Sequence, residues 1–168
     1  RVSAKFLDLL FVILDRKENS HLLDQIALKD MSEVDLARLC QEVNKNMTGR
    51  KPIKSIDLAG NTGINFTVNI SLVKTIVSGG LPLVECLNLS RLNINDGVLL
   101  NLLGKWVKGN KILKKLILDE LDLKNKGIES FLKSIDGDIG LESISFKRNA
   151  IDSTGFGNVV ADFLSKNT

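Results

Sequence analysis

The sequence predicts an α/β fold, a solenoid built from stacked strand–helix repeats. The first observation behind this prediction is an apolar motif, L-x-x-L-x-L, that occurs five times and starts again after 30, 31, 29 and 28 residues. The second is a change of period within each copy, from strand-like alternation to the helical spacing of apolar residues. Four near-equal intervals are hard to obtain by chance, so we expect one repeated supersecondary unit.

Five strands are expected, one in the first half of each copy. Apolar and polar residues alternate there, which is typical of a short strand with one buried face. The strands are expected near residues 23–29, 53–59, 84–90, 113–119 and 141–147. Their apolar positions are Leu23, Ile26 and Leu28; Ile53, Ile56 and Leu58; Val84, Leu87 and Leu89; Leu113, Leu116 and Leu118; and Leu141, Ile144 and Phe146.

Helices are expected in the second halves. Ser32 followed by Asp35 resembles a capping box, and Asp96 and Ser153 can cap two later helices. Apolar residues then recur at three-and-four spacing: Leu36, Leu39, Cys40 and Val43; Leu99, Leu102, Leu103 and Trp106; and Phe156, Val159, Val160 and Phe163. Glycines fall where these helices are expected to stop, at Gly79, Gly80, Gly109 and Gly137.

The chain as a whole, residues 1–168, is predicted to form a single solenoid segment. Residues 1–18 are expected to be the helix of a partial preceding repeat, with Phe6, Leu9, Leu10 and Ile13 on one face. Neither end carries a polar closing element of the kind that a complete solenoid needs, and the first residue is not Met. We therefore expect flanking repeats or another domain in a longer protein.

Stacking determines the expected shape. A short strand and a three-turn helix bury their apolar faces only when copies stack, with a parallel sheet on one side and helices on the other. Helices are about 10 Å wide, whereas neighbouring strands are about 4.8 Å apart. The stack must therefore curve. The predicted architecture is a right-handed β/α superhelix, a horseshoe segment with parallel strands on the concave face and helices on the convex face.

These motifs resemble the ribonuclease-inhibitor-like leucine-rich-repeat family over roughly residues 20 to 168. Asn61 and Asn149 match the consensus asparagine that follows the strand, whereas Met31, Leu92 and Leu121 occupy this place in the other copies. The glycine near the helix start is matched by Gly97, Gly127 and Gly155. In repeat style the chain looks most similar to tropomodulin and to the CARMIL group of capping-protein regulators. The resemblance implies an LRR fold and, by analogy, a protein-binding function.

Composition and motifs exclude several classes of function. The net charge is only +3 and the basic clusters are short, so no nucleic-acid partner is expected. The longest apolar run, Leu9 to Leu14, is too short to cross a bilayer. With one histidine, His21, and two dispersed cysteines, Cys40 and Cys86, we expect no catalytic triad, no metal site and no cofactor. The small number of cysteines favours an intracellular, cytoplasmic protein.

The candidate functional positions are strand residues that point away from the core, because side chains alternate across a strand. Stacking places them in columns on the concave face. The columns are polar and mixed in charge, which suits a protein partner. One column is Ala27, Asp57, Asn88, Ile117 and Ser145; the next is Lys29, Ala59, Ser90, Asp119 and Lys147; the third, at the strand exits, is Asp30, Gly60, Arg91, Glu120 and Arg148.

The leading hypothesis is a non-enzymatic protein-interaction scaffold, actin-regulatory or signalling, that docks its partner on the concave face. The residues expected to bind the partner are Lys29, Asp57, Asn88, Arg91, Asp119, Glu120, Lys147 and Arg148. One alternative is a RanGAP-like GTPase-activating solenoid with a catalytic arginine, Arg91 or Arg148, in a strand-exit loop. Another is a purely structural segment in the middle of a larger array.

Overall fold

The structure is a computed structural model that describes most of the chain from residue 25 onward. The described ranges are 25–29, 31–32, 34–35, 38–39, 54–62, 66–80, 84–137, 139–152 and 156–166, together with Lys5, 8–10 and Val12. Of the helix expected over residues 1–18, the described positions are all helical. His21, Asp30, Cys40 and Ser153 lie outside the described residues.

Five strands form one parallel sheet in chain order, β1-β2-β3-β4-β5. Their bounds are Gln25–Ala27, Ser55–Asp57, Cys86–Asn88, Lys115–Ile117 and Ser143–Ser145. The central residues Ile26, Ile56, Leu87, Leu116 and Ile144 pair with one another across the sheet. The register therefore steps by the same intervals as the apolar motif in the sequence, and the predicted α/β fold with a parallel sheet is confirmed.

The strands are shorter than the expected ranges, but the backbone hydrogen bonds between repeats continue past their ends. Leu118 N–H donates to the Ser145 carbonyl at 2.9 Å, and Glu120 N–H donates to the Lys147 carbonyl at 2.9 Å. Bonds of the same type join each earlier pair of neighbouring repeats at Leu28, Leu58 and Leu89. The strand-exit turns are therefore stacked in register, like the strands that precede them.

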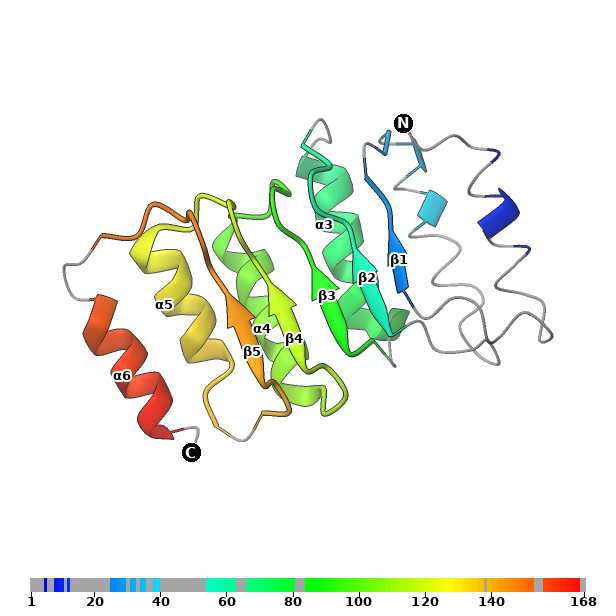
Figure 1. The fold of residues 1–168 in the computed structure, drawn as a ribbon. Helices are drawn as coiled ribbons and strands as arrows, with labels where there is room; N and C mark the ends of the chain where they lie inside the picture. Colours follow the sequence, from blue (N-terminus) through cyan, green and yellow to red (C-terminus); the bar gives the residue numbers. More distant parts are fainter. Residues whose placement is uncertain are drawn as a thin grey trace.

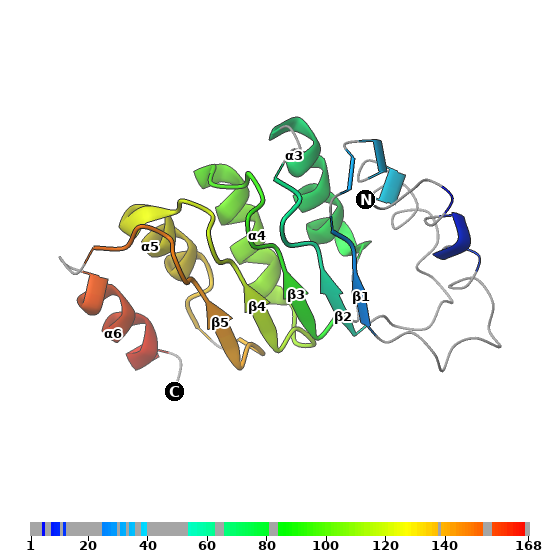
Figure 2. The same cartoon turned by 45° about the horizontal axis from the view of Figure 1, so that its top comes forward.

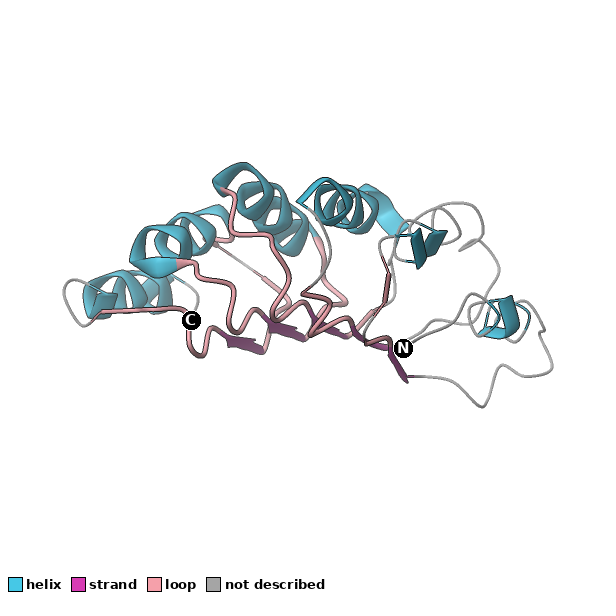
Figure 3. Cartoon of the chain, turned by 90° about the horizontal axis from the view of Figure 1, so that it is seen from above, coloured by secondary structure: helices cyan, strands magenta, loops and turns pink. Residues whose placement is uncertain are grey.

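Helices cover one face of the sheet. They are α3 (Phe66–Thr75), continued by a π-helix (Ile76–Gly80), α4 (Gly97–Gly109), α5 (Lys124–Ser134) and α6 (Phe156–Lys166). Figures 1 and 2 show these helices following one another on the same side of the sheet. In Figure 3 they form one layer and the strands another. The opposite face of the strands carries no helix in the described part of the chain.

The core lies between these two layers and is almost entirely aliphatic. Leu87, Leu116 and Leu118 from the strands are fully buried, as are Leu103 and Phe131 from the helices. Burial of this apolar surface is the main stabilising contribution to such a fold. Asn69 on α3 is an exception, because it is fully buried and its amide atoms have no hydrogen-bond partner among the described residues.

Several expected local signals form as predicted. The Asp96 carboxylate accepts hydrogen bonds from the Val98 and Leu99 N–H groups at the start of α4. Ser32 and Asp35 make the reciprocal bonds of a capping box, with the Asp35 N–H donating to Ser32 Oγ at 3.2 Å. α4 ends at Gly109. These caps fix the start of α4 and of the helical residues after Ser32.

The two consensus asparagines join neighbouring repeats. Asn61 Nδ2 donates to the carbonyls of Leu28 and Leu58, and its Oδ1 accepts from the Met31 N–H at 2.7 Å. Asn149 is 1% exposed and makes the equivalent bonds to Leu118, Leu121 and Leu123 of the preceding repeat. Each side chain thus satisfies backbone groups that would otherwise be buried without partners. The apolar residues at this place, Met31, Leu92 and Leu121, are buried instead.

Candidate protein-binding face of the sheet

The outward-facing strand residues line up as the repeat spacing predicts. Pairing in the sheet places Ala27, Asp57, Asn88, Ile117 and Ser145 in one row. Because neighbouring residues of a strand point to opposite faces, this row lies on the side away from the buried row of Ile56 and Leu116. Figure 3 shows that side without helices. The row therefore belongs to an open face of the sheet.

A shallow depression of about 440 Å³ lies on this face at the strand exits. Five of the eight residues predicted to bind a partner line it: Lys29, Asn88, Arg91, Asp119 and Glu120. Its remaining lining residues are Ala59, Gly60, Ser90 and Ile117.

The other three predicted residues lie beside this depression. Asp57 is 3.9 Å from the Lys29 ammonium, the Lys147 N–H bonds to Asp119, and Arg148 pairs with Glu120. The structure thus brings all eight residues into one connected surface.

Three charged residues of successive repeats form a network at the strand exits. Arg91 donates through Nε and Nη2 to the two carboxylate oxygens of Glu120, each at 2.9 Å. Arg148 donates through Nη1 to Glu120 Oε1 at 3.1 Å. The hydrogen bond from Arg91, with smaller contributions from both guanidinium charges and from the Arg148 hydrogen bond, holds the pKa of Glu120 below its ordinary value. Glu120 likewise raises the pKa of Arg91.

The backbone at these positions is left-handed. Gly60, Arg91, Glu120 and Arg148 occupy the same place in four repeats and have φ angles of 81°, 61°, 57° and 56°. For a residue with a side chain this conformation costs about 1–2 kcal/mol, so glycine is the least costly choice. Three of the four repeats nevertheless carry a charged residue there. The side chains that replace glycine are the ones that join the repeats through the Arg91–Glu120–Arg148 network.

The remaining acidic and amide side chains of the face also accept hydrogen bonds within the protein. Asp119 Oδ1 accepts from the Ser145 hydroxyl at 2.6 Å and from the Lys147 N–H at 2.8 Å, both in the next repeat. Asp57 Oδ1 accepts from the Ala59 N–H at 2.9 Å, and Asn88 Oδ1 accepts from both donors of Ser90. The bonds of Asp57 and Asn88 are the local bonds expected of Asp and Asn in turns.

The sequence analysis did not anticipate these bonds. The signal for the Asp57 and Asn88 bonds was an Asp or Asn two residues before a turn residue, repeated in two copies.

The basic side chains of the face are more exposed than the acidic ones. The Arg148 side chain is 76% exposed and Arg91 is 52% exposed, whereas Glu120 is 31% exposed. Lys115 and Lys147 are exposed and form no ion pair with any residue that the structure describes. The carboxylates are therefore engaged within the protein, and the cations face the solvent.

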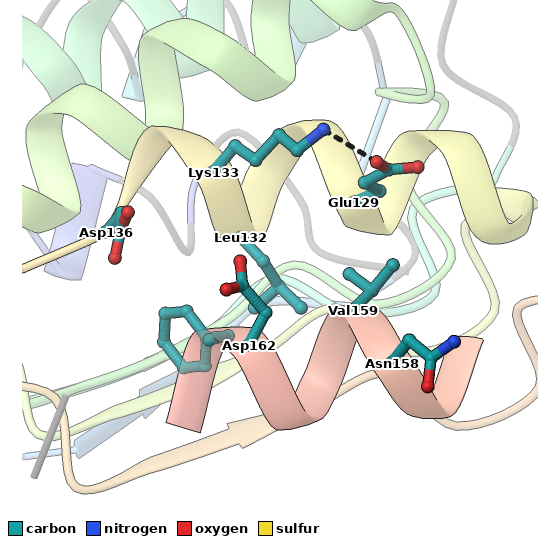
Figure 4. Close-up of a pocket in the computed structure, with 8 residues that line it drawn as sticks. Glu129, Leu132, Lys133, Asp136, Asn158, Val159 and Asp162 are labelled. Atoms are coloured by element: carbon teal, nitrogen blue, oxygen red, sulfur yellow. Dashed lines mark hydrogen bonds and ion pairs between the residues drawn. The ribbon is translucent and has the colours of Figure 1, made fainter. Parts of the chain in front are cut away.

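A second depression, of about 250 Å³, lies between α5 and α6 (Figure 4). Its apolar part is formed by Leu132, Val159 and Phe163. Ion pairs border it, with Lys133 at 2.7 Å from Glu129 and Lys166 bridging Asp136 and Asp162. The sequence analysis did not predict this site. Glu129–Lys133 and Asp162–Lys166, each four residues apart on a helix, were its only local signals.

The described part of the chain contains neither a metal-binding cluster nor a membrane-spanning helix. No group of three or more His, Cys, Asp or Glu side chains among these residues could hold a metal ion. None of the described helices is long and apolar enough to span a membrane. Cys86, on β3, is a free cysteine that is partly exposed.

The repeat geometry defines a leucine-rich-repeat-like α/β fold, with a five-stranded parallel sheet on one side and helices on the other. No protein-family model and no curated protein sequence matches the chain. Among solved structures, the chain is similar to the actin-binding site 2 of leiomodin-1, with a TM-score of 0.61 and 15% sequence identity. The match covers 99% of this chain and 91% of the leiomodin-1 chain. At this identity the similarity concerns the fold.

Proposed function

We propose that the chain is a non-enzymatic protein-interaction module that docks a protein partner on the open strand face and its strand-exit turns. The observation that carries this proposal is the convergence of Lys29, Asn88, Arg91, Asp119 and Glu120 on one depression. This depression lies on the face that the helices leave uncovered. The face alternates charged, amide and hydroxyl groups with the apolar side chain of Ile117. This composition is typical of a polar protein interface.

Other ligand classes fit this face less well. Sites for small molecules are concave and mostly apolar and enclose most of their ligand, whereas this depression is shallow and lined by charged groups. Nucleic acid is bound by a continuous stripe of basic residues, and here Asp57, Asp119 and Glu120 interrupt the cations. A protein partner whose surface carries both charges therefore fits this face best.

The finer proposal concerns the partner and its compartment. We propose that the chain acts in the cytoplasm as an actin-regulatory protein. We also propose that its repeats form a curved, right-handed superhelix of the ribonuclease-inhibitor type. Two observations support it: the repeat style, which resembles tropomodulin and the CARMIL group, and the fold similarity to the actin-binding site 2 of leiomodin-1. Actin is therefore the first partner to test.

We do not propose the GTPase-activating alternative. A catalytic arginine finger must reach the transferring phosphoryl group of its partner, and Arg91 and Arg148 both hold Glu120. A GTP-hydrolysis assay with a Ran-type GTPase tests this directly. Acceleration by the wild-type chain that is lost in Arg91→Ala or Arg148→Ala would replace the binding proposal by an enzymatic one.

The proposed function is tested by a pair of charge-reversal variants. Lys147→Glu with Arg148→Glu changes the open face, and Lys105→Glu with Lys126→Glu makes the same change in net charge on exposed positions of α4 and α5. Asp119 is left unchanged, because its carboxylate anchors the neighbouring repeat. Binding to monomeric and filamentous actin is measured by fluorescence anisotropy and co-sedimentation. Affinity capture from an extract of expressing cells, quantified by mass spectrometry, covers other partners.

We expect the wild-type chain and the helix-face variant to retain the same partner and the open-face variant to lose it. If actin does not bind but another captured protein shows this pattern, the docking face stands and the actin proposal falls. If every partner is retained by the open-face variant, the docking face itself is wrong, and the structural-segment hypothesis replaces it.

A further inference from the structure

We infer that Arg91 and Arg148 form a preorganised carboxylate-binding pair that selects an acidic segment of the protein partner. The inference rests on the proposed function and specifies the chemistry of what docks there. It starts from the arrangement of charge on the β3–β5 half of the open face. The acidic groups there have partners within the protein, whereas the basic groups keep donors that no described residue uses.

The hydrogen-bond partners show which donors remain for a ligand. A guanidinium has five N–H donors. Arg91 uses Nε and Nη2 to hold Glu120, and Arg148 uses Nη1. The structure gives these two side chains no other hydrogen bond among the described residues. Both guanidiniums contact the same carboxylate oxygen, so they are neighbours, and their remaining donors face the solvent.

The two arginines are also held in place. Each follows a strand, has a left-handed backbone and is tied to Glu120 of the repeat between them. Long side chains normally lose much conformational freedom when they bind a ligand. Here Glu120 has already restricted both of them. Planar guanidiniums fixed in this way suit the bidentate geometry of a carboxylate.

Neighbouring groups extend the same preference. The Lys147 ammonium precedes Arg148 in the chain and has no ion pair within the described residues, and the nearby Asp119 carboxylate accepts two bonds from its own protein. Ile117 lies in the floor of the depression and offers an apolar contact. The matching ligand is a short acidic segment with an apolar side chain among its carboxylates.

The face favours such a peptide over a nucleic acid. Sequence-independent binding of single strands combines a basic groove with aromatic side chains on which bases stack. The described outward positions of the five strands and their exits hold no aromatic residue. A carboxylate of a protein needs no such aromatic residues for binding. The arginine pair and the adjacent Lys147 ammonium group are enough.

The test is an NMR titration of the isotope-labelled full chain with the synthetic peptide EEELEEE. The peptide QQQLQQQ and a heptathymidine oligonucleotide serve as competing probes. The variants are Arg91→Gln with Arg148→Gln on the open face, and Lys105→Gln with Lys126→Gln as a control with the same loss of charge.

We expect EEELEEE to shift the amide signals of Arg91, Lys147 and Arg148. The dissociation constant for EEELEEE should rise by about fivefold or more in the double arginine variant. Each exposed charge pair contributes modestly to the binding free energy, but the contributions of the two arginines add. The constant should stay within about twofold in the lysine control, whose substitutions lie on α4 and α5.

Equal binding of QQQLQQQ or tighter binding of the oligonucleotide would overturn the inference. A partner that is lost only in the open-face variant, together with an unaffected peptide titration, would reject the acidic ligand and keep the docking face. A peptide that binds at the arginines when no partner depends on this face would instead reject the proposed function.

Discussion

The fourth and fifth repeats carry the same motif but are buried to different extents. Leu113, Leu116 and Leu118 of the fourth copy are 0% exposed. Leu141, Ile144 and Phe146 occupy the same places in the fifth copy and are only partly buried. The apolar pattern is therefore equal in the two copies, and the difference comes from what lies on either side of each.

The helices show the same contrast. α4 buries Leu99, Leu100, Leu103, Gly104 and Val107 between its neighbours, whereas α6 has no fully buried residue. α4 is flanked by α3 and α5, and α6 packs against α5 (Figure 1). A repeat of this type therefore completes the core of the one before it. Stability should be concentrated in the middle of the stack, and this expectation can be tested by matched substitutions.

The largest effect is expected from truncating equivalent strand residues. Leu116→Ala removes a fully buried side chain, and such changes cost about 3–5 kcal/mol of unfolding free energy because a cavity remains. Ile144→Ala should lower the unfolding free energy by less than about 2 kcal/mol. The Ile144 side chain is partly exposed to solvent in the folded protein, so its burial contributes less to stability. Urea denaturation followed by circular dichroism measures both. Equal losses would show that the fifth repeat is as well covered as the fourth.

Asn149 tests whether bonds between repeats compensate for poorer burial. It belongs to the fifth repeat, but its amide pairs with Leu118, Leu121 and Leu123 of the fourth. Asn149→Ala leaves these buried backbone groups unpaired and should cost about 2–3 kcal/mol.

Asn158→Ala, at an exposed position of α6, is the control and should change the unfolding free energy by less than about 0.5 kcal/mol. Similar small losses in the two variants would mean that solvent replaces the Asn149 bonds.

Two glycines allow helix packing to be compared between the middle of the stack, at α4, and its last helix, α6. A Cβ at Gly104 of α4 would overlap Ser134 Oγ and lie 2.8 Å from Ser134 Cβ on α5. Gly104→Ala must therefore separate the two helices, which should cost about 1–3 kcal/mol. A Cβ at Gly157 of α6 meets nothing within 4 Å, so Gly157→Ala should raise stability by about 0.5–1 kcal/mol through helix propensity. Thermal unfolding should show melting temperatures that move in opposite directions.

Much of the fold could be predicted because the determinants are local and periodic. The register follows from the spacing of Ile26, Ile56, Leu87, Leu116 and Ile144, since a slip by one residue would turn an apolar row outward. The cap at Asp96 could be predicted for the same reason, because it depends on residues within one turn. The unequal burial of the repeats depends on neighbouring copies, and no single copy encodes it.

The candidate site could be predicted in position but not in detail. Alternation along each strand is enough to place Lys29, Asn88 and Asp119 on one face. The left-handed backbone at Arg91 and Glu120 had no signal, because sequence patterns associate that conformation with glycine. The shared use of Glu120 by two arginines depends on side-chain directions in three repeats. The depression between α5 and α6 depends on how two helices pack, which the sequence does not specify.

The smallest expected effect concerns the protonation of Glu120, which belongs to the fourth repeat and pairs with Arg148 of the fifth. Its folded pKa is lowered, mainly by the Arg91 hydrogen bond. A carboxylate of this kind stabilises the fold above its unfolded pKa, about 4.3, and the contribution is lost as the pH falls through the folded pKa. Between pH 5 and pH 3 the wild type should therefore lose slightly more stability than Glu120→Gln. Because the network is exposed, salt should reduce the difference.

Carboxyl NMR titration of Glu120 separates the contributions of the two arginines. Arg91→Gln should move the Glu120 midpoint up toward the ordinary glutamate value, because it removes the hydrogen bond that contributes most to the lowered pKa. Arg148→Gln should move it in the same direction by a smaller amount, since its hydrogen bond and charge contribute less. A larger shift in Arg148→Gln would mean that Glu120 is held mainly by the fifth repeat. The network would then depend on the less buried end of the stack rather than on the Arg91–Glu120 pair of the third and fourth repeats.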